Sequence, residues 1–311
     1  MYQYRDNLPQ LDTKIFLMDG GMETTLIFQQ GVELPEFASF DLLSIESGKQ
    51  ILREYFIPYL ELARQSKRGF IMESATWRAN PDWGTKIGYS LDELVDMNHK
   101  AIELLQELRN RCQTPDSPLV ISGCIGPRGD GYRAENKMTV AEARNYHAFQ
   151  INVLTETAAD FISALTLNYV EEAVGIALAA KDANMPVVIS FTTETDGHLP
   201  TGMTLQEAIE TVEAATDDYP AYYKINCAHP QHFISALKRG EPWMQRIRAL
   251  RANASCKSHA ELDESTELDR GNPIELARYY RELRQDFPKL TILGGCCGTD
   301  IEHVRAINAA C

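Results

Sequence analysis

The sequence lacks a long apolar run, a basic cluster and a low-complexity segment. No stretch reaches the roughly 18 consecutive apolar residues that a membrane-spanning helix needs, and residues 1–9 contain no apolar signal-peptide core. Lys and Arg number 30 against 44 Asp and Glu, which gives a formal net charge of −14. Because binding to nucleic acids or anionic membranes depends on clustered cations, we expect neither partner. We predict a cytoplasmic protein that acts on small molecules; the sequence does not fix its oligomeric state.

The sequence also lacks the cysteine pattern of a disulfide framework. Its seven cysteines are an odd number in a chain of 311 residues, whereas disulfide scaffolds are typically short and secreted. A bridge between the adjacent Cys296 and Cys297 is further disfavoured by the geometry that a disulfide requires. We therefore expect reduced thiols, with the isolated Cys112, Cys256 and Cys311 acting as small hydrophobic residues.

No linker rich in Pro, Gly or Ser divides the chain, so a single domain over residues 1–311 is the simplest interpretation. The 44% hydrophobic and 24% charged residues are sufficient for a packed core. Short apolar runs recur along the chain and are rich in Ile, Leu, Val and Phe, as is typical of strands buried on both faces. The eight predicted strands are Ile15–Met18, Gly69–Met72, Leu119–Ser122, Phe161–Leu165, Val187–Phe191, Tyr222–Ile225, Ile247–Leu250 and Leu290–Leu293.

Helix signals lie between these runs. Ser90, Thr139 and Thr204 are each followed three residues later by Glu, which is the pattern of a capping box. Eight successive strand-then-helix units predict a (β/α)8 TIM barrel, with its active site at the C-terminal ends of the strands. A doubly wound open sheet is the alternative, but no G-x-G-x-x-G follows the first strand.

The cysteines at two of these strand ends could converge on one metal ion. The last predicted strand runs into Gly294-Gly295-Cys296-Cys297-Gly298, and Cys227 follows the sixth strand. Thr299 to Glu302 then matches a capping box that would begin the next helix. Three thiolates with one open position are typical of a catalytic zinc, since structural zinc sites are closed by four protein ligands. We therefore predict a Zn²⁺ site formed by Cys227, Cys296 and Cys297.

Charge counting indicates what such a site does. Zn²⁺ with three thiolates carries a formal charge of −1 and is a weak Lewis acid, so hydrolysis is not its best reaction. A substrate thiol in the fourth position would be deprotonated and nucleophilic, which predicts alkyl transfer onto sulfur. His259-Ala260-Glu261 matches half of a nucleobase-deaminase signature, but the P-C-x-x-C half is absent. We instead place His259 in a polar loop, residues 255–272, that forms a solvated face or a mobile lid.

Four motifs at the strand ends together resemble the homocysteine S-methyltransferase family. They are Asp19-Gly20-Gly21, Ile125-Gly126-Pro127, Asn226-Cys227 and Gly294 to Gly298. The resemblance covers nearly the whole chain and implies a (β/α)8 barrel in which the three cysteines bind zinc. It also implies a methyltransferase that moves a methyl group from an S-methylmethionine- or betaine-like donor to the thiol of homocysteine, giving methionine. Asp19 and Asn226 would then line the amino-acid pocket.

The chain departs from the family at two strand ends. Leu165 replaces the acid of a Glu-Thr pair that holds the substrate's amino group, while Thr166 keeps the second position. Residues 252–255 read Ala-Asn-Ala-Ser in place of Pro-Asn-Ser-Gly. Of the other acids at this end of the barrel, Glu23, Glu73 and Glu194, we expect Glu73 to take over because it directly follows its strand. The alternatives are the same zinc–thiolate chemistry on a different thiol or methylated substrate, or a non-catalytic thiol-binding homologue.

Further residues at the strand ends have more than one interpretation. Trp77 and Trp83 would either pack a methyl-onium donor through cation–π contact or simply pack their loop. Cys124 is expected to form a small part of the pocket wall, and His229 to begin a helix rather than bind metal. No separate cobalamin or folate module fits in the chain, so we expect a small free donor.

Overall fold

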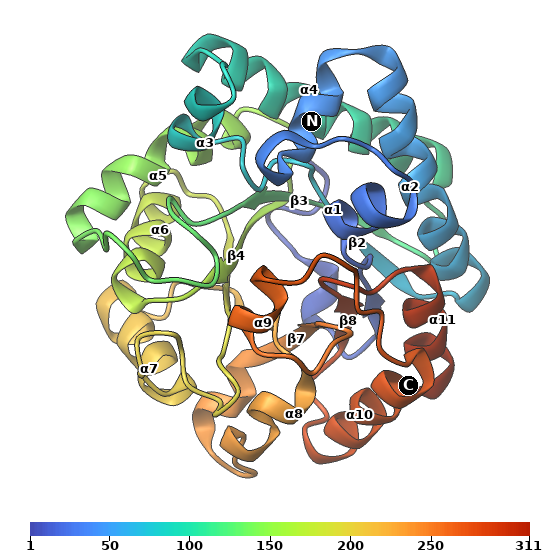
Figure 1. Cartoon of the computed structure of the whole chain (residues 1–311), viewed down its shortest axis with the longest axis vertical. Coiled ribbons are helices and arrows are strands. Elements are labelled where there is room, and N and C mark those ends of the chain that lie inside the picture. The colour runs from blue at the N-terminus through green and yellow to red at the C-terminus, as the bar shows by residue number, and fades with distance from the viewer.

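The computed structural model describes residues 1–311, and its core is a closed barrel of eight parallel strands in chain order (Figure 1). All eight predicted strands are present, although several end later than expected and the last begins at Ile292 rather than Leu290. The strands are β1 (Phe16–Leu17), β2 (Gly69–Glu73), β3 (Leu119–Ile125), β4 (Phe161–Leu167), β5 (Val187–Phe191), β6 (Tyr222–Asn226), β7 (Ile247–Ala252) and β8 (Ile292–Gly295).

Helices surround the barrel (Figure 1). The longer ones are α2 (Glu46–Ser66), α4 (Leu91–Cys112), α5 (Val140–Thr155), α6 (Val170–Asp182), α7 (Leu205–Thr216), α10 (Pro273–Asp286) and α11 (Ile301–Ala310). The shorter ones are α1 (Met22–Thr24), α3 (Pro81–Lys86), α8 (Pro230–Phe233) and α9 (His259–Asp263). The (β/α)8 TIM barrel predicted from the sequence is therefore confirmed. None of the helices combines the length and the apolar character that a membrane span requires.

The helix starts follow the predicted capping boxes, with one correction. Ser90, Thr139 and Thr204 cap α4, α5 and α7 as expected. For α11 the prediction was wrong by one residue: Asp300 is the cap and accepts from the amide of Glu302. Thr299 instead donates its hydroxyl hydrogen to the carbonyl of Cys296 at 2.7 Å, because it closes the turn that carries the cysteines.

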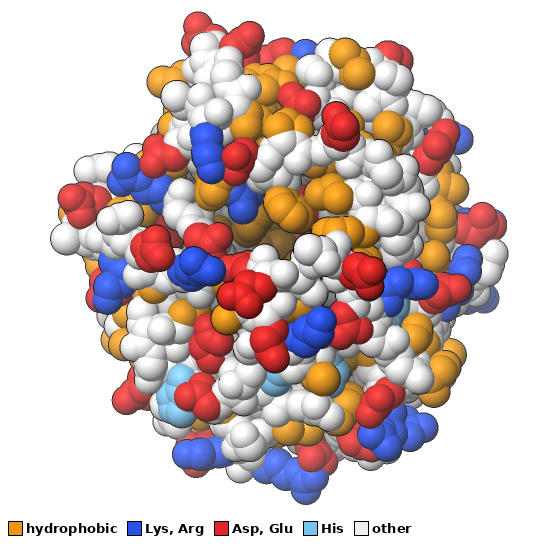
Figure 2. Space-filling view, in the orientation of Figure 1, with side chains coloured by type: hydrophobic (Ala, Val, Ile, Leu, Met, Phe, Trp, Pro, Cys, Tyr) orange, Lys and Arg blue, Asp and Glu red, His pale blue; other side chains and the backbone are white.

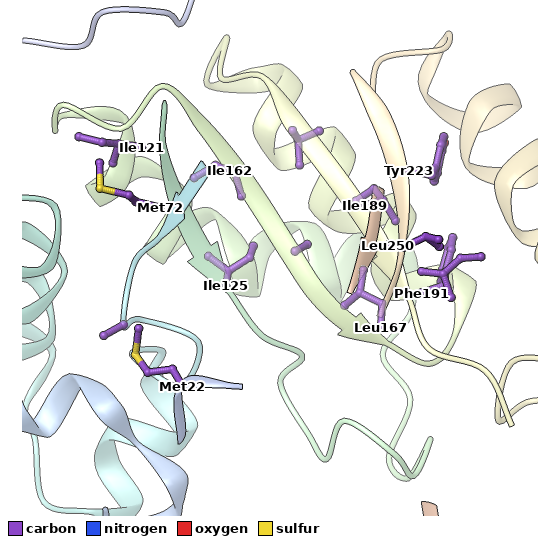
Figure 3. Packing of buried hydrophobic residues seen from close by; sticks show 14 of the residues in the cluster. Met22, Met72, Ile121, Ile125, Ile162, Leu167, Ile189, Phe191, Tyr223 and Leu250 are labelled. Atoms are coloured by element: carbon purple, nitrogen blue, oxygen red, sulfur yellow. The ribbon is translucent and has the colours of Figure 1, made fainter. Parts of the chain in front are cut away.

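Two hydrophobic clusters hold the fold together. A large cluster of 69 buried residues packs the outer faces of the strands against the helices, with Ile121, Ile162 and Ile189 among its members (Figure 3). A second cluster of ten fills one end of the barrel interior with Leu8, Phe16, Met18, Ile71, Val120, Phe161, Val188, Tyr222, Ala249 and Ile292. Because both faces of each strand are covered, the strands read as continuous apolar runs.

The barrel interior changes character two residues further along the strands. Side chains in a strand point to the same face at every second position, so Glu73, Lys224 and Arg251 lie above Ile71, Tyr222 and Ala249. These three charged residues are at most 5% exposed. The interior is thus an apolar layer topped by a charged layer, and the charged layer lies toward the C-terminal ends of the strands.

Candidate active site

A cavity of about 250 Å³ opens at the C-terminal ends of the strands. In the space-filling view it is the hollow near the centre of the molecule, with hydrophobic side chains in its wall (Figure 2). The three predicted metal ligands and the four predicted substrate-binding residues all line it: Cys227, Cys296, Cys297, Asp19, Glu73, Thr166 and Asn226. The site predicted from the sequence therefore maps onto one cavity.

The cysteines converge because of the strand register. β7 lies between β6 and β8, and its carbonyls anchor the residues that follow both neighbours: the Arg251 carbonyl accepts from the Cys227 amide at 3.0 Å, and the Ala252 carbonyl from the Cys296 amide at 2.8 Å. The three Sγ atoms of Cys227, Cys296 and Cys297 lie within 4.8 Å of one another. Cys227 has a φ of +53°, an uncommon backbone conformation for a residue with a side chain, and such outliers cluster at functional sites.

A disulfide joins Cys227 to Cys296, and their Cα atoms are 5.4 Å apart. The expectation that these two cysteines are reduced thiols is thus wrong for this structure. The physical reason is the register, which brings residues 69 positions apart to a separation that suits a disulfide. Cys297 and the remaining four cysteines are free, so the adjacent pair is unbridged as expected.

The donor set fits a soft metal ion once the disulfide is reduced. Three sulfur atoms that meet at the end of a cavity match the thiolate preference of zinc, and the cavity leaves room for a further ligand. Burial raises the pKa of the Cys297 thiol, and a bound cation would offset that effect by stabilising the thiolate. The hydroxyl of Tyr132 donates to the Cys297 sulfur at 3.6 Å.

The paired glycines let the loop after β1 pack against the cysteine loop. A Cβ atom at Gly21 would lie only 2.5 Å from the carbonyl oxygen of Cys296, so no larger residue fits there without a shift of the backbone. The amide of Gly21 donates to the Thr299 carbonyl, and the amide of Gly295 donates to the Asp19 carbonyl at 2.8 Å. The two motifs therefore form one structural unit beside the thiols.

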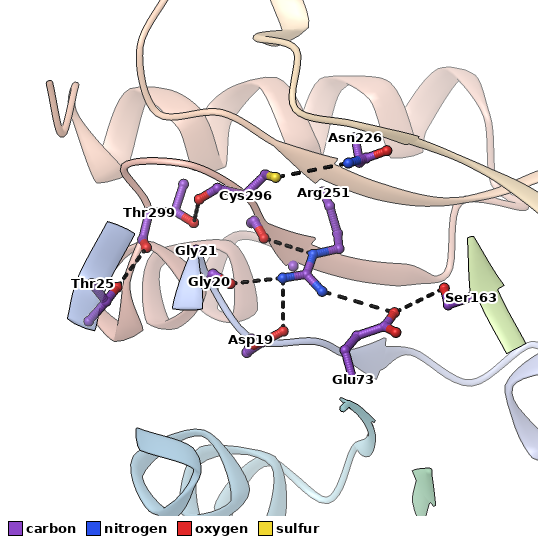
Figure 4. Close-up of polar contacts among 12 residues, drawn as sticks. Asp19, Gly20, Gly21, Thr25, Glu73, Ser163, Asn226, Arg251, Cys296 and Thr299 are labelled. Atoms are coloured by element: carbon purple, nitrogen blue, oxygen red, sulfur yellow. Dashed lines mark hydrogen bonds and ion pairs between the residues drawn. The ribbon is translucent and has the colours of Figure 1, made fainter. Parts of the chain in front are cut away.

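Glu73 and Arg251 of the charged layer line the cavity together with Asp19. Figure 4 shows the contacts of Arg251 with Asp19 and Glu73. Lys224 donates to a Glu73 carboxylate oxygen at 2.5 Å, and Arg251 lies 3.0 Å from Asp19 and 4.0 Å from Glu73. Burial acts to raise the pKa of Glu73, but the charges of Lys224 and Arg251 outweigh it and hold the pKa below its usual value. Burial also raises the pKa of Asp19, to about 6, against the opposing effect of Arg251.

Asn226 organises the wall next to the cysteines. Its side-chain oxygen accepts from the Thr166 amide at 3.0 Å, and its side-chain nitrogen donates to the Thr166 hydroxyl at 2.8 Å and faces the Cys296 sulfur at 4.0 Å. Thr166 follows Leu165 on an irregular part of β4 and has a φ of +66°, which is rare for a β-branched residue. The apolar Leu165 side chain itself lines the cavity.

The three acids considered as substitutes at Leu165 differ in their surroundings. Glu73 is paired with Lys224. Glu194 faces His259 at 3.2 Å and does not line the cavity. Glu23 does line the cavity and accepts a hydrogen bond from Ser39 at 2.8 Å. The assignment of Glu73 to the substrate's amino group stays a prediction.

The sequence did not predict that His259 and Tyr132 pack against each other beside the cysteines. The expectation of a solvated face is wrong for His259, which is 4% exposed and stacks on Tyr132 with ring centroids 4.0 Å apart. Because a carbonyl only accepts, the contact of 2.9 Å to the Cys227 carbonyl places a hydrogen on His259 Nε2. The physical reason is a capping box between Ser258 and Glu261, which begins α9 and turns His259 inward. The Ser258–Glu261 pattern in the sequence could have predicted the start of this helix.

Trp77 and Trp83, which follow β2, pack against the side chain of Arg78. The Arg78 guanidinium carbon lies 3.5 Å from the ring centroid of Trp83 and 4.8 Å from that of Trp77. The face of Trp83 is therefore occupied, and only Trp77 of the two lines the cavity. His229 caps the start of α8, as predicted, and Cys124 is a buried residue of the cavity wall.

The chain is similar in sequence to a known family of proteins. A sequence model of the family described as homocysteine S-methyltransferase matches residues 16–311. Homocysteine S-methyltransferase 2 of Arabidopsis thaliana is 22% identical, over 94% of this chain and 91% of that protein. Selenocysteine Se-methyltransferase of Brassica oleracea var. italica is 24% identical, over 94% and 87%.

Solved structures share the fold. The oxidised form of the homocysteine methyltransferase MmuM from Escherichia coli superposes with a TM-score of 0.75 at 20% identity and covers 98% of both chains. The metallated form of MmuM gives a TM-score of 0.74 at 20% identity and covers 96% of both chains.

Proposed function

This chain belongs to the homocysteine S-methyltransferase family and is a methyltransferase, and from this premise we propose that it methylates the thiol of homocysteine to give methionine. The donor would be a small onium compound of the S-methylmethionine or betaine type. A bond forms between the methyl carbon and the acceptor sulfur while the donor's bond to that carbon breaks. The sulfur or nitrogen of the donor loses its positive charge when the methyl group leaves, and the proton of the acceptor thiol is released. The convergence of three cysteine sulfurs in the cavity carries the proposal.

Cys227, Cys296 and Cys297 would hold Zn²⁺ after reduction of the disulfide. Bound zinc would lower the pKa of the acceptor thiol and leave its sulfur nucleophilic. The donor set supports this assignment, and the related MmuM has been solved in a metallated form.

The remaining residues of the cavity would bind and orient the substrates. The Asn226 amide and the Thr166 hydroxyl lie beside the cysteines, where they would position the sulfur end of the acceptor. Asp19 and Glu73 would shape the charged part of the cavity wall. Leu165 and the ring of Tyr132 add apolar surface that would exclude water from the reacting sulfur.

A second candidate is the same chemistry on a different thiol. Leu165 favours it, because an apolar side chain in the cavity wall offers no hydrogen bond to an ammonium group. The two candidates share the metal site and differ only in the acceptor.

The test begins with the reduced protein reconstituted with zinc. We expect stoichiometric zinc in the wild type, its loss in Cys227→Ser and Cys297→Ser, and its retention in the control Cys112→Ser, which lies on α4 outside the cavity. Mass spectrometry would then follow methyl transfer from S-methylmethionine and from betaine to homocysteine. Full zinc binding by Cys297→Ser would refute the metal assignment. A zinc-loaded protein that methylates other thiols but never homocysteine would favour the second candidate.

A further inference from the structure

Arg78 in the cavity wall has a guanidinium group without an acceptor. Its Nε and Nη1 atoms are buried and make no hydrogen bond, and no carboxylate forms an ion pair with it. Trp83 and Trp77 hold the group in place through their ring faces. A polar group buried in this way is costly, and a buried cation more so, unless something pairs with it.

The other cations around the cavity already have partners. Arg251 pairs with Asp19, Arg128 with Asp82 at 2.7 Å, and Lys86 with Glu36 at 2.7 Å. Burial lowers the pKa of Arg78 to about 10, while the negative charges of Asp130 and Glu23 act against that effect from a distance. Arg78 therefore remains a cation at neutral pH and is the one that the fold leaves unpaired at this cavity.

Three of the five carboxylates that line the cavity already face a cation. Asp19 and Glu73 face buried cations, and Asp263 lies 3.2 Å from Arg133. Glu23 accepts from Ser39, and Asp130 accepts from the backbone amides of Tyr132 and Arg133. The cavity thus presents an unsatisfied donor for an anion, whereas each of its carboxylates already accepts a hydrogen bond or faces a cation.

We propose that Arg78 is the specificity determinant of this cavity and binds the carboxylate of a substrate, and that the cavity recognises its substrate by this carboxylate rather than by an ammonium group. A guanidinium offers two parallel donors that match the two oxygens of a carboxylate. If the carboxylate is that of the acceptor, the acceptor class is a mercaptocarboxylate in which the α-amino group contributes little. The inference rests on the proposed methyl transfer, and the carboxylate belongs to the acceptor or to the donor.

Binding experiments on the reduced, zinc-loaded protein test the acceptor. Calorimetry would compare homocysteine, 4-mercaptobutyrate, which lacks the ammonium, and homocysteinamide, which lacks the carboxylate. In the wild type we expect the first two to bind within about threefold, and the amide about 10- to 100-fold more weakly, as the loss of a charge-assisted hydrogen bond implies. Arg78→Gln should weaken the binding of homocysteine by the same factor and leave the binding of homocysteinamide unchanged.

Two further variants separate recognition from structure. Arg78→Lys keeps the charge but loses the two parallel donors of the guanidinium. Its affinity for homocysteine should therefore lie between those of the wild type and Arg78→Gln. Arg128→Gln removes a nearby cation that does not line the cavity and should bind like the wild type. If Arg78→Gln weakens the amide as much as homocysteine, its role is structural and the proposal is wrong.

The donor arm uses steady-state kinetics with S-methylmethionine and with trimethylsulfonium, which has no carboxylate. A raised KM for S-methylmethionine alone in Arg78→Gln would assign the carboxylate to the donor, and a raised KM for homocysteine alone would assign it to the acceptor. No change in either, or homocysteine binding more than tenfold tighter than 4-mercaptobutyrate to the wild type, would overturn the proposal. If the wild type methylates no thiol, the proposed function fails, while the binding comparison still tests Arg78.

Discussion

In the barrel interior, ten apolar side chains fill one layer, whereas the layer above it holds Glu73, Lys224 and Arg251. The same strands build both layers, only two residues apart, and both are buried. The apolar layer gains stability by leaving water. The charged layer loses its hydration, and the pairing of its charges offsets that loss only in part, so the layer is better explained by its place beside the cavity than by a gain in stability.

Breaking one ion pair should expose this difference most strongly. Lys224→Met would leave the Glu73 carboxylate buried without its 2.5 Å partner, and we expect a loss of about 3–5 kcal/mol in the free energy of unfolding. Urea unfolding followed by circular dichroism measures it. The double variant Lys224→Met/Glu73→Gln is the control and should regain much of the loss. A single variant within about 1 kcal/mol of the wild type would mean that the two layers tolerate change equally.

The charges behind the cysteine loop should make stability depend on pH, in contrast to the apolar layer. Burial acts to raise the pKa of Asp300, but the hydrogen bond and charge of His303, together with the charge of Arg270, outweigh it and hold the pKa well below its usual value. Such a carboxylate stabilises the fold above its unfolded pKa, and the contribution is lost as the pH falls through the folded pKa.

Asp300→Asn keeps the cap of α11 but removes the charge. We expect a loss of about 2 kcal/mol at pH 7, in line with a charge-assisted hydrogen bond. The wild type and the variant should converge as the pH falls below about 4, toward the usual pKa of Asp and beyond. Unfolding curves at pH 3 to 8 measure the difference. A gap that stays constant over that range would contradict the assignment of the effect to the charge.

A small deletion in the apolar layer should give the smallest effect. Ile71→Val removes one methylene from a fully buried position two residues before Glu73. We expect a loss of about 1 kcal/mol that does not vary with pH, since no charge is involved. The same urea unfolding series measures it. A clear pH dependence would show that the two layers are coupled.

The two layers also differ in how well they could be predicted from the sequence. The eight strands were predictable because strands covered on both faces leave continuous apolar runs, as Val187–Phe191 does. The charged layer was not, because Lys224 interrupts such a run and its partner Glu73 lies 151 positions away. The convergence of the three cysteines was predictable because each follows a predicted strand, Cys296 and Cys297 after two glycines and Cys227 after Asn226. Their disulfide depends on the register of β6, β7 and β8, which no local pattern encodes.

The interlocked loops after β1 and β8 have a consequence for how the protein is made. β1 pairs with β8, and Gly21 packs against the Cys296 carbonyl, so the first and last strands must meet before the thiols are held in place. During synthesis Cys227 leaves the ribosome before Cys296, which follows it by 69 positions. The three sulfurs can therefore meet only after β8 has joined β1 and the barrel has closed. A metal ion that needs all three sulfurs would therefore bind only after barrel closure.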